Sequence, residues 1–286
     1  MEKAQSIGVV GAGTMGAGIA QACLVAGLPV VVIDIDEERV ARGRAAIAAG
    51  LARSVSKAAM AAADRDAALE RLRGACDYAA LRSCDFISEA ATENEALTVA
   101  ILQRIDGVAR AGCIIATNTS SISVGRLAEV VTRPSAFVGT HFFNPVAVMN
   151  LVEVVHGPKT GDATVAAAVS LAKRLGKTPV VVKDAPGFVV NRLLCPMLNE
   201  AVLAYSQGIA SAHDIDEAMR LGCNHPIGPL ALCDLIGLDV VLAVMKVFQH
   251  DFEDPKYRPA PLLEEMVAAG HLGRKSGRGF FTYDAP

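Results

Sequence analysis

With 286 residues the chain exceeds the roughly 100 to 200 residues of one compact domain, so one larger and one smaller domain are expected. Its 52% hydrophobic and 20% charged residues exclude a disordered protein, and a net charge of −3 excludes a general basic field for nucleic acid. No apolar run reaches about 18 residues and no leader precedes the first apolar element. We therefore expect no membrane partner and a cytoplasmic location.

The N-terminal segment has the pattern of a strand, a turn, a helix and a second strand. Residues 6–10 form an apolar run that ends in glycines, and residues 14–25 are compatible with a helix. Residues 29–33 form a β-branched run that closes on Asp34. A βαβ unit of this kind begins a parallel sheet.

Helices and strands then alternate up to residue 185. Residues 36–74 are rich in Ala, Arg, Glu and Lys, which predicts long helices that form an arm inserted into the sheet domain. Further strands are expected at residues 84–89, 113–117, 136–142, 151–155 and 179–183, with helices at 95–109, 123–131 and 162–175. The predicted fold class is α/β, a Rossmann-type doubly wound sheet over residues 1–185.

Beyond Pro186 and Gly187 the strand pattern stops. Helices are expected at residues 188–206, 212–221, 230–250 and 262–269, which predicts a smaller all-helical domain over residues 186–286. This segment is strongly apolar for a lone small domain, so we expect it to bury surface in a homodimer.

Cysteine and histidine spacing gives no sign of a metal centre. The seven cysteines are scattered without a CxxC pair, and the six histidines form no HxxxH spacing. Reduced structural thiols are therefore expected, and a metal site is not.

A glycine-rich loop lies between the first strand and the first helix. It consists of Gly11, Ala12, Gly13, Thr14, Met15 and Gly16. The first glycine permits a tight turn, the second a close approach of the backbone to a pyrophosphate, and the third packing of helix on strand. The motif alone is weak evidence, but here it follows a strand and opens a helix. We predict a dinucleotide site.

Asp34, at the end of the second strand, selects the type of dinucleotide. Its carboxylate can accept hydrogen bonds from both adenosine ribose hydroxyls and would repel a 2′-phosphate. No Arg or Lys directly follows it, only Ile35, Asp36 and Glu37. The sequence therefore favours NAD over NADP.

His141 and Glu153 are candidates for the chemical step. A lone histidine among Val138, Phe142 and Phe143 is more often part of the core. Glu153, however, lies in the apolar run LVEVV, where an unpaired charge would be costly, so it needs a partner. The two positions are symmetric about Ala147, so antiparallel strands would place them opposite one another. We predict a pair in which Glu153 orients an imidazole that exchanges a proton with substrate.

Asn118 and Ser120 follow the predicted strand 113–117 at its carboxyl end, where open α/β sheets bind ligands. A hydroxyl there can hold a reacting oxygen. Both residues are equally ordinary in a plain turn, and the residues alone do not decide between these readings.

These motifs together resemble the short-chain L-3-hydroxyacyl-CoA dehydrogenases, and among them the bacterial 3-hydroxybutyryl-CoA dehydrogenases, over nearly the whole chain. The resemblance is carried by GAGTMGAGIA, NTSS, HFFNPVAVM, LVEVV, PGFVVNRLL, DIDEAMRLG, HPIGPLALCDLIGLD and GRKSGRGF. It implies NAD-dependent interconversion of (S)-3-hydroxyacyl-CoA and 3-oxoacyl-CoA. Each motif alone is moderately specific, and the set is highly specific.

The resemblance also implies roles for single residues. His141 would be the general acid/base with Glu153 as its orienting partner, while Ser120 and Asn191 would contact the reacting oxygen. An alternative for Asn191 is a structural amide that ties the two domains together.

Further residues would bind the two nucleotide-like ligands. The cofactor contacts implied are Glu93, Asn118, Asn144 and Lys275. Arg53 and Lys57 on the helical arm would meet the phosphates of CoA, for which a solvated helix face is the alternative.

Two positions depart from the family pattern, because Thr98 and Asn150 stand where a lysine is usual. The first change puts a cofactor contact in doubt, and the second affects substrate affinity. Two other classes of function stay open: a two-domain hydroxy-acid dehydrogenase that uses a catalytic lysine, and a crystallin-like relative that binds cofactor without turnover. The pairing of His141 with Glu153 argues against both.

Overall fold

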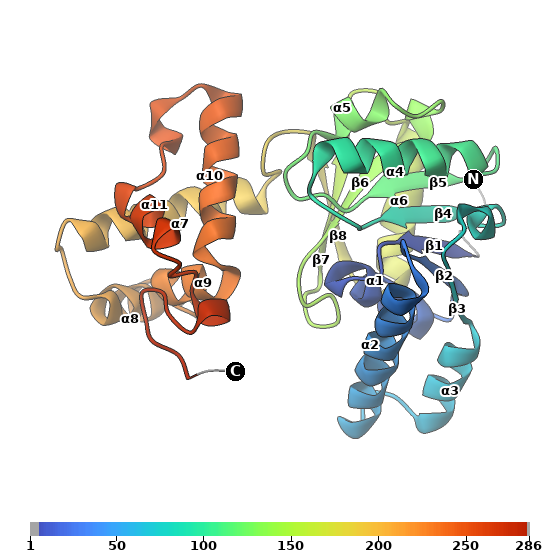
Figure 1. The fold of residues 1–286 in the computed structure, drawn as a ribbon, viewed down its shortest axis with the longest axis horizontal. Coiled ribbons are helices and arrows are strands. Elements are labelled where there is room, and N and C mark those ends of the chain that lie inside the picture. Colours follow the sequence, from blue (N-terminus) through green and yellow to red (C-terminus); the bar gives the residue numbers. More distant parts are fainter. Residues whose placement is uncertain (1–5, 285–286) are drawn as a thin grey trace. The chain divides into compact units, whose positions relative to one another are not determined.

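The computed structural model describes residues 6–284, which divide into two compact units (Figure 1). Unit 1 extends to Ala185 and unit 2 begins at Pro186. Each unit has its own hydrophobic core. Within the described residues, no helix combines the length and the apolar character that crossing a membrane would require.

Unit 1 contains a mainly parallel sheet in the order β3-β2-β1-β4-β5-β6-β7-β8. The strands are β1 (Ile7–Val10), β2 (Val30–Ile33), β3 (Leu72–Ala75), β4 (Phe86–Glu89), β5 (Ile114–Thr117), β6 (Phe137–Phe142), β7 (Leu151–His156) and β8 (Thr178–Lys183). The pairing of β6 with β7 is antiparallel, whereas every other neighbouring pair is parallel. The chain reverses its crossover direction between β1 and β4, which puts the carboxyl ends of these strands where doubly wound folds bind ligands. The predicted α/β fold class is confirmed.

Helices cover both faces of this sheet (Figure 1). They are α1 (Thr14–Val25), α2 (Glu37–Ser56), α3 (Ala62–Glu70), α4 (Glu95–Val108), α5 (Val124–Ala128) and α6 (Asp162–Arg174), with short 3-10 turns η1 (Tyr78–Leu81) and η2 (Pro134–Ala136). Apolar side chains of α1 and α6 join those of β1 and β2 in one core cluster, so these two helices share a face. The helices α2 and α3 extend away from the sheet as the predicted arm.

Two predicted elements of unit 1 were wrong in their extent. The arm does not stay helical to residue 74, because Leu72–Ala75 forms β3, which pairs with β2 at the edge of the sheet. The two central residues of β3, an arginine and a glycine, are exposed, so this strand lacks the apolar signal of the buried ones. The helix predicted at 123–131 ends at Ala128 and is followed by turns leading to Pro134.

Unit 2 consists mainly of helices, with two isolated β-bridges between residues 273 and 282. It contains α7 (Val190–Ser206), α8 (Ala212–Gly222), α9 (Pro229–Ile236), α10 (Leu238–Phe252) and α11 (Pro261–Ala268), with 3-10 turns η3 (Pro255–Tyr257) and η4 (Arg274–Ser276). The single helix predicted over 230–250 was wrong, because the chain breaks at Gly237, whose φ is +104°. Such an angle ends a helix and is strained for any residue other than glycine.

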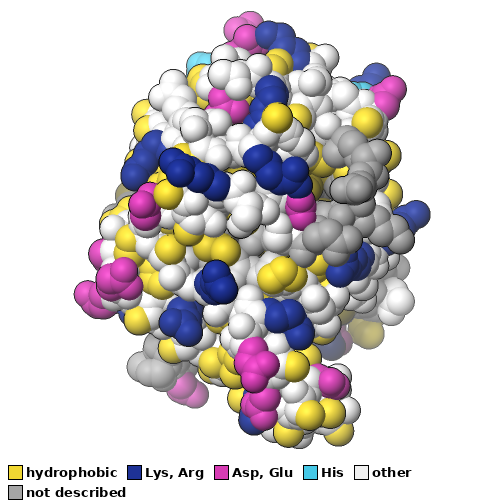
Figure 2. Space-filling model, turned by 90° about the vertical axis from the view of Figure 1, so that its right-hand side faces the viewer, with side chains coloured by type: hydrophobic (Ala, Val, Ile, Leu, Met, Phe, Trp, Pro, Cys, Tyr) yellow, Lys and Arg dark blue, Asp and Glu magenta, His cyan; other side chains and the backbone are white. Residues whose placement is uncertain are grey.

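The charged surface is mixed in sign. Figure 2 shows Lys and Arg side chains separated by apolar, acidic and uncharged groups across the face turned to the viewer. Such a face has no continuous basic stripe of the kind that follows a nucleic-acid backbone.

Candidate active site

The glycine loop follows β1 and forms the start of α1. Gly11 has a φ of +100°, and a Cβ there would also come within 2.6 Å of the Cα of Ala91. A Cβ on Gly16 would overlap the carbonyl oxygen of Gly11. A Cβ on Gly13, in contrast, would meet no atom within 4 Å. Packing therefore accounts for Gly11 and Gly16, while the space over Gly13 fits a ligand that approaches the backbone.

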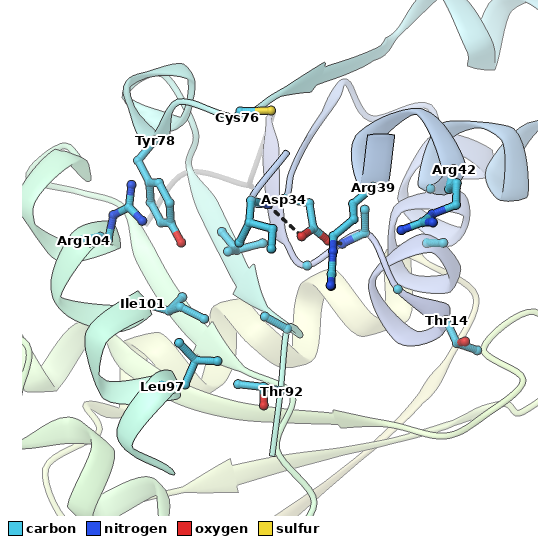
Figure 3. Close-up of a pocket in the computed structure, with 18 of the residues that line it drawn as sticks. Thr14, Asp34, Arg39, Arg42, Cys76, Tyr78, Thr92, Leu97, Ile101 and Arg104 are labelled. Carbon is cyan, nitrogen blue, oxygen red and sulfur yellow. Dashed lines mark hydrogen bonds between the residues drawn. The ribbon is translucent and has the colours of Figure 1, made fainter. Parts of the chain in front are cut away.

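A cavity of about 680 Å³ opens over this loop (Figure 3). Gly11, Ala12, Gly13 and Thr14 line it. Because Gly13 is the N-cap of α1 and contributes no side chain, the first N–H groups of the helix remain available to a phosphate. Two other predicted contacts, Met15 and Gly16, do not line the cavity: Met15 packs against the core and Gly16 is buried.

Asp34 lies at the rim of the same cavity, directly after β2 (Figure 3). Its Oδ2 accepts a hydrogen bond from the backbone N–H of Ala12 at 2.7 Å, and its Oδ1 accepts one from Ile35 at 2.8 Å. These bonds fix the carboxylate beside the loop. Its remaining lone pairs can accept the two hydroxyls of a ribose.

The opposite wall of the cavity is formed by η1 and α4 (Figure 3). The guanidinium carbon of Arg104 lies 4.1 Å from the centre of the Tyr78 ring. Ile101 and Leu97 continue this wall, and Leu97 is 52% exposed. A flat apolar wall of this kind suits a purine base. Tyr78 and Arg104 lie on separate elements and carry no motif, so neither residue was predicted from the sequence.

His141 and Glu153 lie directly opposite one another in the antiparallel pair of β6 and β7. His141 Nδ1 is 2.8 Å from Glu153 Oε2, and the two side chains are only 8% and 1% exposed. The Phe143 ring lies 4.4 Å from the imidazole. A carboxylate so far removed from water is tolerated only with a close hydrogen-bonded partner, and the imidazole supplies one. The geometry fixes the orientation of the histidine ring.

The loop after β5 carries Ser120 and is held by Glu93. The Glu93 carboxylate accepts hydrogen bonds from Thr119 Oγ1 at 2.7 Å, from the Ser120 backbone N–H at 2.9 Å and from Ser121 Oγ at 3.0 Å. Beside this loop, buried Asn118 accepts a hydrogen bond from the backbone N–H of Phe142 at 3.0 Å. Glu93 and Asn118 therefore fix the loop and the end of β6 in this structure.

Comparison with protein families identifies the chain. The family model described as "3-hydroxyacyl-CoA dehydrogenase, NAD binding domain" matches residues 6–185, and the one described as "3-hydroxyacyl-CoA dehydrogenase, C-terminal domain" matches residues 187–283. The chain belongs to the 3-hydroxyacyl-CoA dehydrogenase family. The predicted resemblance and the expected cofactor, NAD, are confirmed. The protein is an NAD-dependent oxidoreductase.

Individual relatives match nearly the whole chain. The chain is 44% identical to the 3-hydroxybutyryl-CoA dehydrogenase of Bradyrhizobium diazoefficiens, and the match covers 98% of this chain and 95% of that enzyme. A probable 3-hydroxybutyryl-CoA dehydrogenase of Deinococcus radiodurans is 45% identical, with coverage of 96% and 99%. The crystal structure of (S)-3-hydroxybutyryl-CoA dehydrogenase from Ralstonia eutropha shares 55% identity and a TM-score of 0.97, with coverage of 99% and 100%.

The two positions that depart from the family pattern are uncharged in the dehydrogenase and differ in burial. Thr98 is fully buried in α4, and its hydroxyl donates to the Thr92 carbonyl at 3.4 Å. Asn150 is exposed, and its carbonyl accepts the backbone N–H of Thr178 at 2.7 Å. A lysine does reach the same loop from elsewhere, since Lys177 Nζ donates to the Met149 carbonyl at 2.9 Å.

Of the remaining predicted site residues, Arg53, Lys57 and Asn144 do not line the cavity over the glycine loop, and Asn191 and Lys275 belong to unit 2. Arg53 and Lys57 are exposed at the end of α2, four residues apart and therefore on one side of the helix. In unit 2, Asn191 lies in the first turn of α7, and Lys275 Nζ is 2.7 Å from Asp239 Oδ2. Asn144 follows β6 at the start of the loop to β7.

Glu89, at the end of β4, is a further buried carboxylate that the sequence analysis missed. It is 1% exposed and accepts hydrogen bonds at 2.9 Å from the Ala91 backbone N–H and from Thr117 Oγ1. Burial raises the pKa of Glu89 above its ordinary value. The signal was present in FISEA, where an acidic residue stands in an apolar strand just as Glu153 does.

Neither a metal cluster nor a disulfide forms part of the described site. Between residues 6 and 284, no three His, Cys, Asp or Glu side chains gather as ligands of an ion would. The seven cysteines there are all free thiols.

Proposed function

We propose that the dehydrogenase interconverts (S)-3-hydroxybutyryl-CoA and acetoacetyl-CoA by means of the His141–Glu153 pair. The observation that carries this proposal is the 2.8 Å contact between His141 Nδ1 and Glu153 Oε2 in an almost fully buried environment. The choice of a short acyl chain is supported by the names of the relatives in Bradyrhizobium diazoefficiens and Ralstonia eutropha.

In this mechanism the imidazole moves the proton of the reacting oxygen. With Nδ1 directed to Glu153, His141 Nε2 is the atom that takes the proton from the 3-hydroxyl and returns it in the reverse reaction. Glu153 stabilises the imidazolium that forms, because a buried carboxylate and a cation attract strongly. Ser120 and Asn191 hold the substrate oxygen by hydrogen bonds. Bound NAD would supply the acceptor for the hydride that leaves C3 of the substrate.

The residues present fit the adenosine half of NAD. The open space over Gly13 accommodates the pyrophosphate, and the Asp34 carboxylate receives the ribose hydroxyls. A 2′-phosphate would bring negative charge against Asp34, so NADPH is expected to be a poor substitute. By resemblance, Glu93 and Asn144 belong to the nicotinamide side of the cofactor site, and Asn118 and Lys275 are further contacts to the cofactor.

The CoA end of the substrate would bind at the arm. Arg53 and Lys57 present two cations on one exposed side of α2, which supports a contact with the CoA phosphates.

The assembly and location are part of the same proposal. Unit 2 exposes Leu193 by 69% and Leu221 by 77%, which supports a homodimer formed through the C-terminal helices. Seven free thiols support work in a reducing compartment such as the cytoplasm.

The deciding experiment is a spectrophotometric screen of 3-oxoacyl-CoA substrates of graded chain length, with NADH and NADPH in parallel. We expect the highest kcat/KM with acetoacetyl-CoA and NADH. A maximum at a longer acyl chain would contradict the short-chain assignment, and a preference for NADPH would contradict the role of Asp34. If no substrate consumed NADH at any pH, a crystallin-like binding protein would replace the proposed reaction.

A further inference from the structure

Asp184 is a carboxylate at the very end of unit 1 that has no role in the reaction as proposed so far. It directly follows β8 and stands two residues before Pro186, where unit 2 begins. Its Oδ2 accepts hydrogen bonds from Ser123 Oγ at 2.8 Å and from the Gly125 backbone N–H at 2.7 Å, and its Oδ1 accepts the Val124 backbone N–H at 3.1 Å.

All three donors belong to the start of α5, immediately after the loop that carries Ser120. Gly125 makes the approach possible, since a Cβ at this position would come within 3.1 Å of Asp184 Oδ2 and 3.0 Å of Pro158 Cδ. Ser123 also accepts the Arg126 backbone N–H at 3.2 Å and so caps the same helix. The contact is thus a compact anchor between the last strand of the sheet and the start of α5.

The Ser120 loop is consequently fixed at both ends by carboxylates from other elements. Glu93 receives the hydrogen bonds of residues 119–121, and Asp184 receives those of residues 123–125. Only the short stretch around Ile122 lies between them, and Ile122 itself is buried. A loop held at both ends cannot shift its backbone at Ser120 without breaking charge-assisted hydrogen bonds.

We propose that Asp184 is a positioning residue, which fixes the loop that carries Ser120. This inference rests on the proposed function, in which the Ser120 hydroxyl holds the reacting oxygen. Asp184 acts through Ser120 and does not touch the substrate. The transition state depends on the placement of this hydroxyl, because small misplacements of a contacting group cost large factors in rate.

The test is a double-mutant cycle between Asp184→Asn and Ser120→Ala, measured with acetoacetyl-CoA and NADH. Asparagine has one acceptor oxygen in place of two, so it cannot accept all three hydrogen bonds. We expect Asp184→Asn alone to lower kcat by about tenfold, but by less than about twofold when Ser120 is already alanine. Rates are normalised to the NADH-binding stoichiometry, so that a fraction of unfolded enzyme does not count as a loss.

The matched control is Asp106→Asn. Asp106 is half-buried like Asp184 and lies near the C-terminal end of α4 in unit 1. Its Oδ2 accepts a hydrogen bond from the backbone N–H of Thr132 at 2.9 Å. We expect its kcat to stay within about twofold of the wild type. If Asp184→Asn fails to fold, Ser123→Ala takes the place of this variant in the same cycle. Ser123→Ala removes only one of the three hydrogen bonds to Asp184, so a smaller loss of kcat is expected.

The outcomes separate the inference from the proposed function. Equal losses from Asp184→Asn with and without the Ser120 hydroxyl would overturn the positioning role while leaving the reaction intact. Near-normal turnover of Asp184→Asn would do the same. If instead the wild type did not turn over acetoacetyl-CoA, or if Ser120→Ala were fully active, the proposed function itself would fail.

Discussion

Buried or hydrogen-bonded carboxylates hold the polar groups of the site in place. Asp34 fixes the turn after β1, Glu89 joins the ends of β4 and β5, and Asp184 fixes the start of α5. Glu153 does the same for the imidazole of His141. A charged acceptor bonds about twice as strongly as a neutral one, so these groups restrict the loops before substrate binds. Such preorganisation lowers the entropy that the reaction must lose.

Replacing His141 by glutamine tests the general acid/base role. Glutamine retains hydrogen bonding but cannot exchange the proton, so kcat should fall by about 10²- to 10⁴-fold. The dissociation constant of NADH, measured by fluorescence titration, should change little, because His141 does not line the cavity over the glycine loop. His156→Gln is the matched control, since this histidine ends β7 and lies 2.9 Å from the Thr160 carbonyl. Near-normal turnover of His141→Gln would refute the assignment.

Replacing Glu89 by glutamine tests the effect of burial on a carboxylate. Burial raises the pKa of Glu89 above 4.5. At a pH between 4.5 and the raised pKa, the Glu89 carboxyl therefore keeps its proton in the folded protein but has lost it in the unfolded protein. The stability contributed by this group is complete below pH 4.5 and is lost as the pH rises through the raised pKa.

We therefore expect Glu89→Gln to gain stability relative to the wild type as the pH rises above 4.5, by about 1.4 kcal/mol for each unit of pKa shift. Urea unfolding of both proteins at several pH values measures the difference. Parallel stability curves for variant and wild type would show that Glu89 titrates normally.

At the scale of elements, the glycines of the loop have two different roles, since Gly13 leaves space for the cofactor and Gly16 allows close packing. Gly13 has an extended backbone, with φ −70° and ψ −170°, that alanine can adopt, but its Cβ would enter the space assigned to the pyrophosphate. Gly13→Ala should therefore weaken NADH binding by at least about tenfold with little change in the urea midpoint. Gly16→Ala should lower stability by about 1 to 3 kcal/mol, because its Cβ would overlap the Gly11 carbonyl. The opposite assignment of these two effects would show that Gly13 is a packing residue.

The sequence predicted most elements because buried strands and amphipathic helices have distinct periods. Prediction failed where an element has no such period, as in β3, whose Arg73 and Gly74 are exposed at the sheet edge. It also failed at Gly237, because the apolar pattern continues unchanged from α9 into α10 although the backbone turns. Conformation at one glycine is set by tertiary contacts that periodicity does not record.

The site was predictable where two residues share one strand pair. The symmetry of His141 and Glu153 about Ala147 led to the register that the structure has. The wall of Tyr78 and Arg104 was not predictable in this way, since η1 and α4 come together only through the fold. Asp184 is a similar case, because it stands 59 positions after Gly125 and nothing in the intervening sequence indicates their contact.

At the scale of the whole molecule, the apolar surface of unit 2 is the main feature that one chain leaves unexplained. Leu221 in α8 is 77% exposed, Ile209 is 70% exposed, and Leu193 in α7 is 69% exposed. Burying one leucine side chain contributes about 1.5 to 3 kcal/mol to the free energy of association. In a dimer with two-fold symmetry each such contact occurs twice. Such side chains supply the apolar centre that a stable interface needs.

We expect sedimentation velocity at micromolar concentration to show a dimer for the wild type, and a shift towards monomer for Leu221→Glu or Leu193→Glu. A glutamate at the centre of an apolar interface loses its hydration without gaining a partner, which costs several kcal/mol. Val25→Glu is the control, because Val25 is 54% exposed at the end of α1 in unit 1, outside the proposed interface. A monomeric wild type would remove the dimer proposal outright. If both leucine variants stayed dimeric while Val25→Glu dissociated, the interface would have to lie on unit 1.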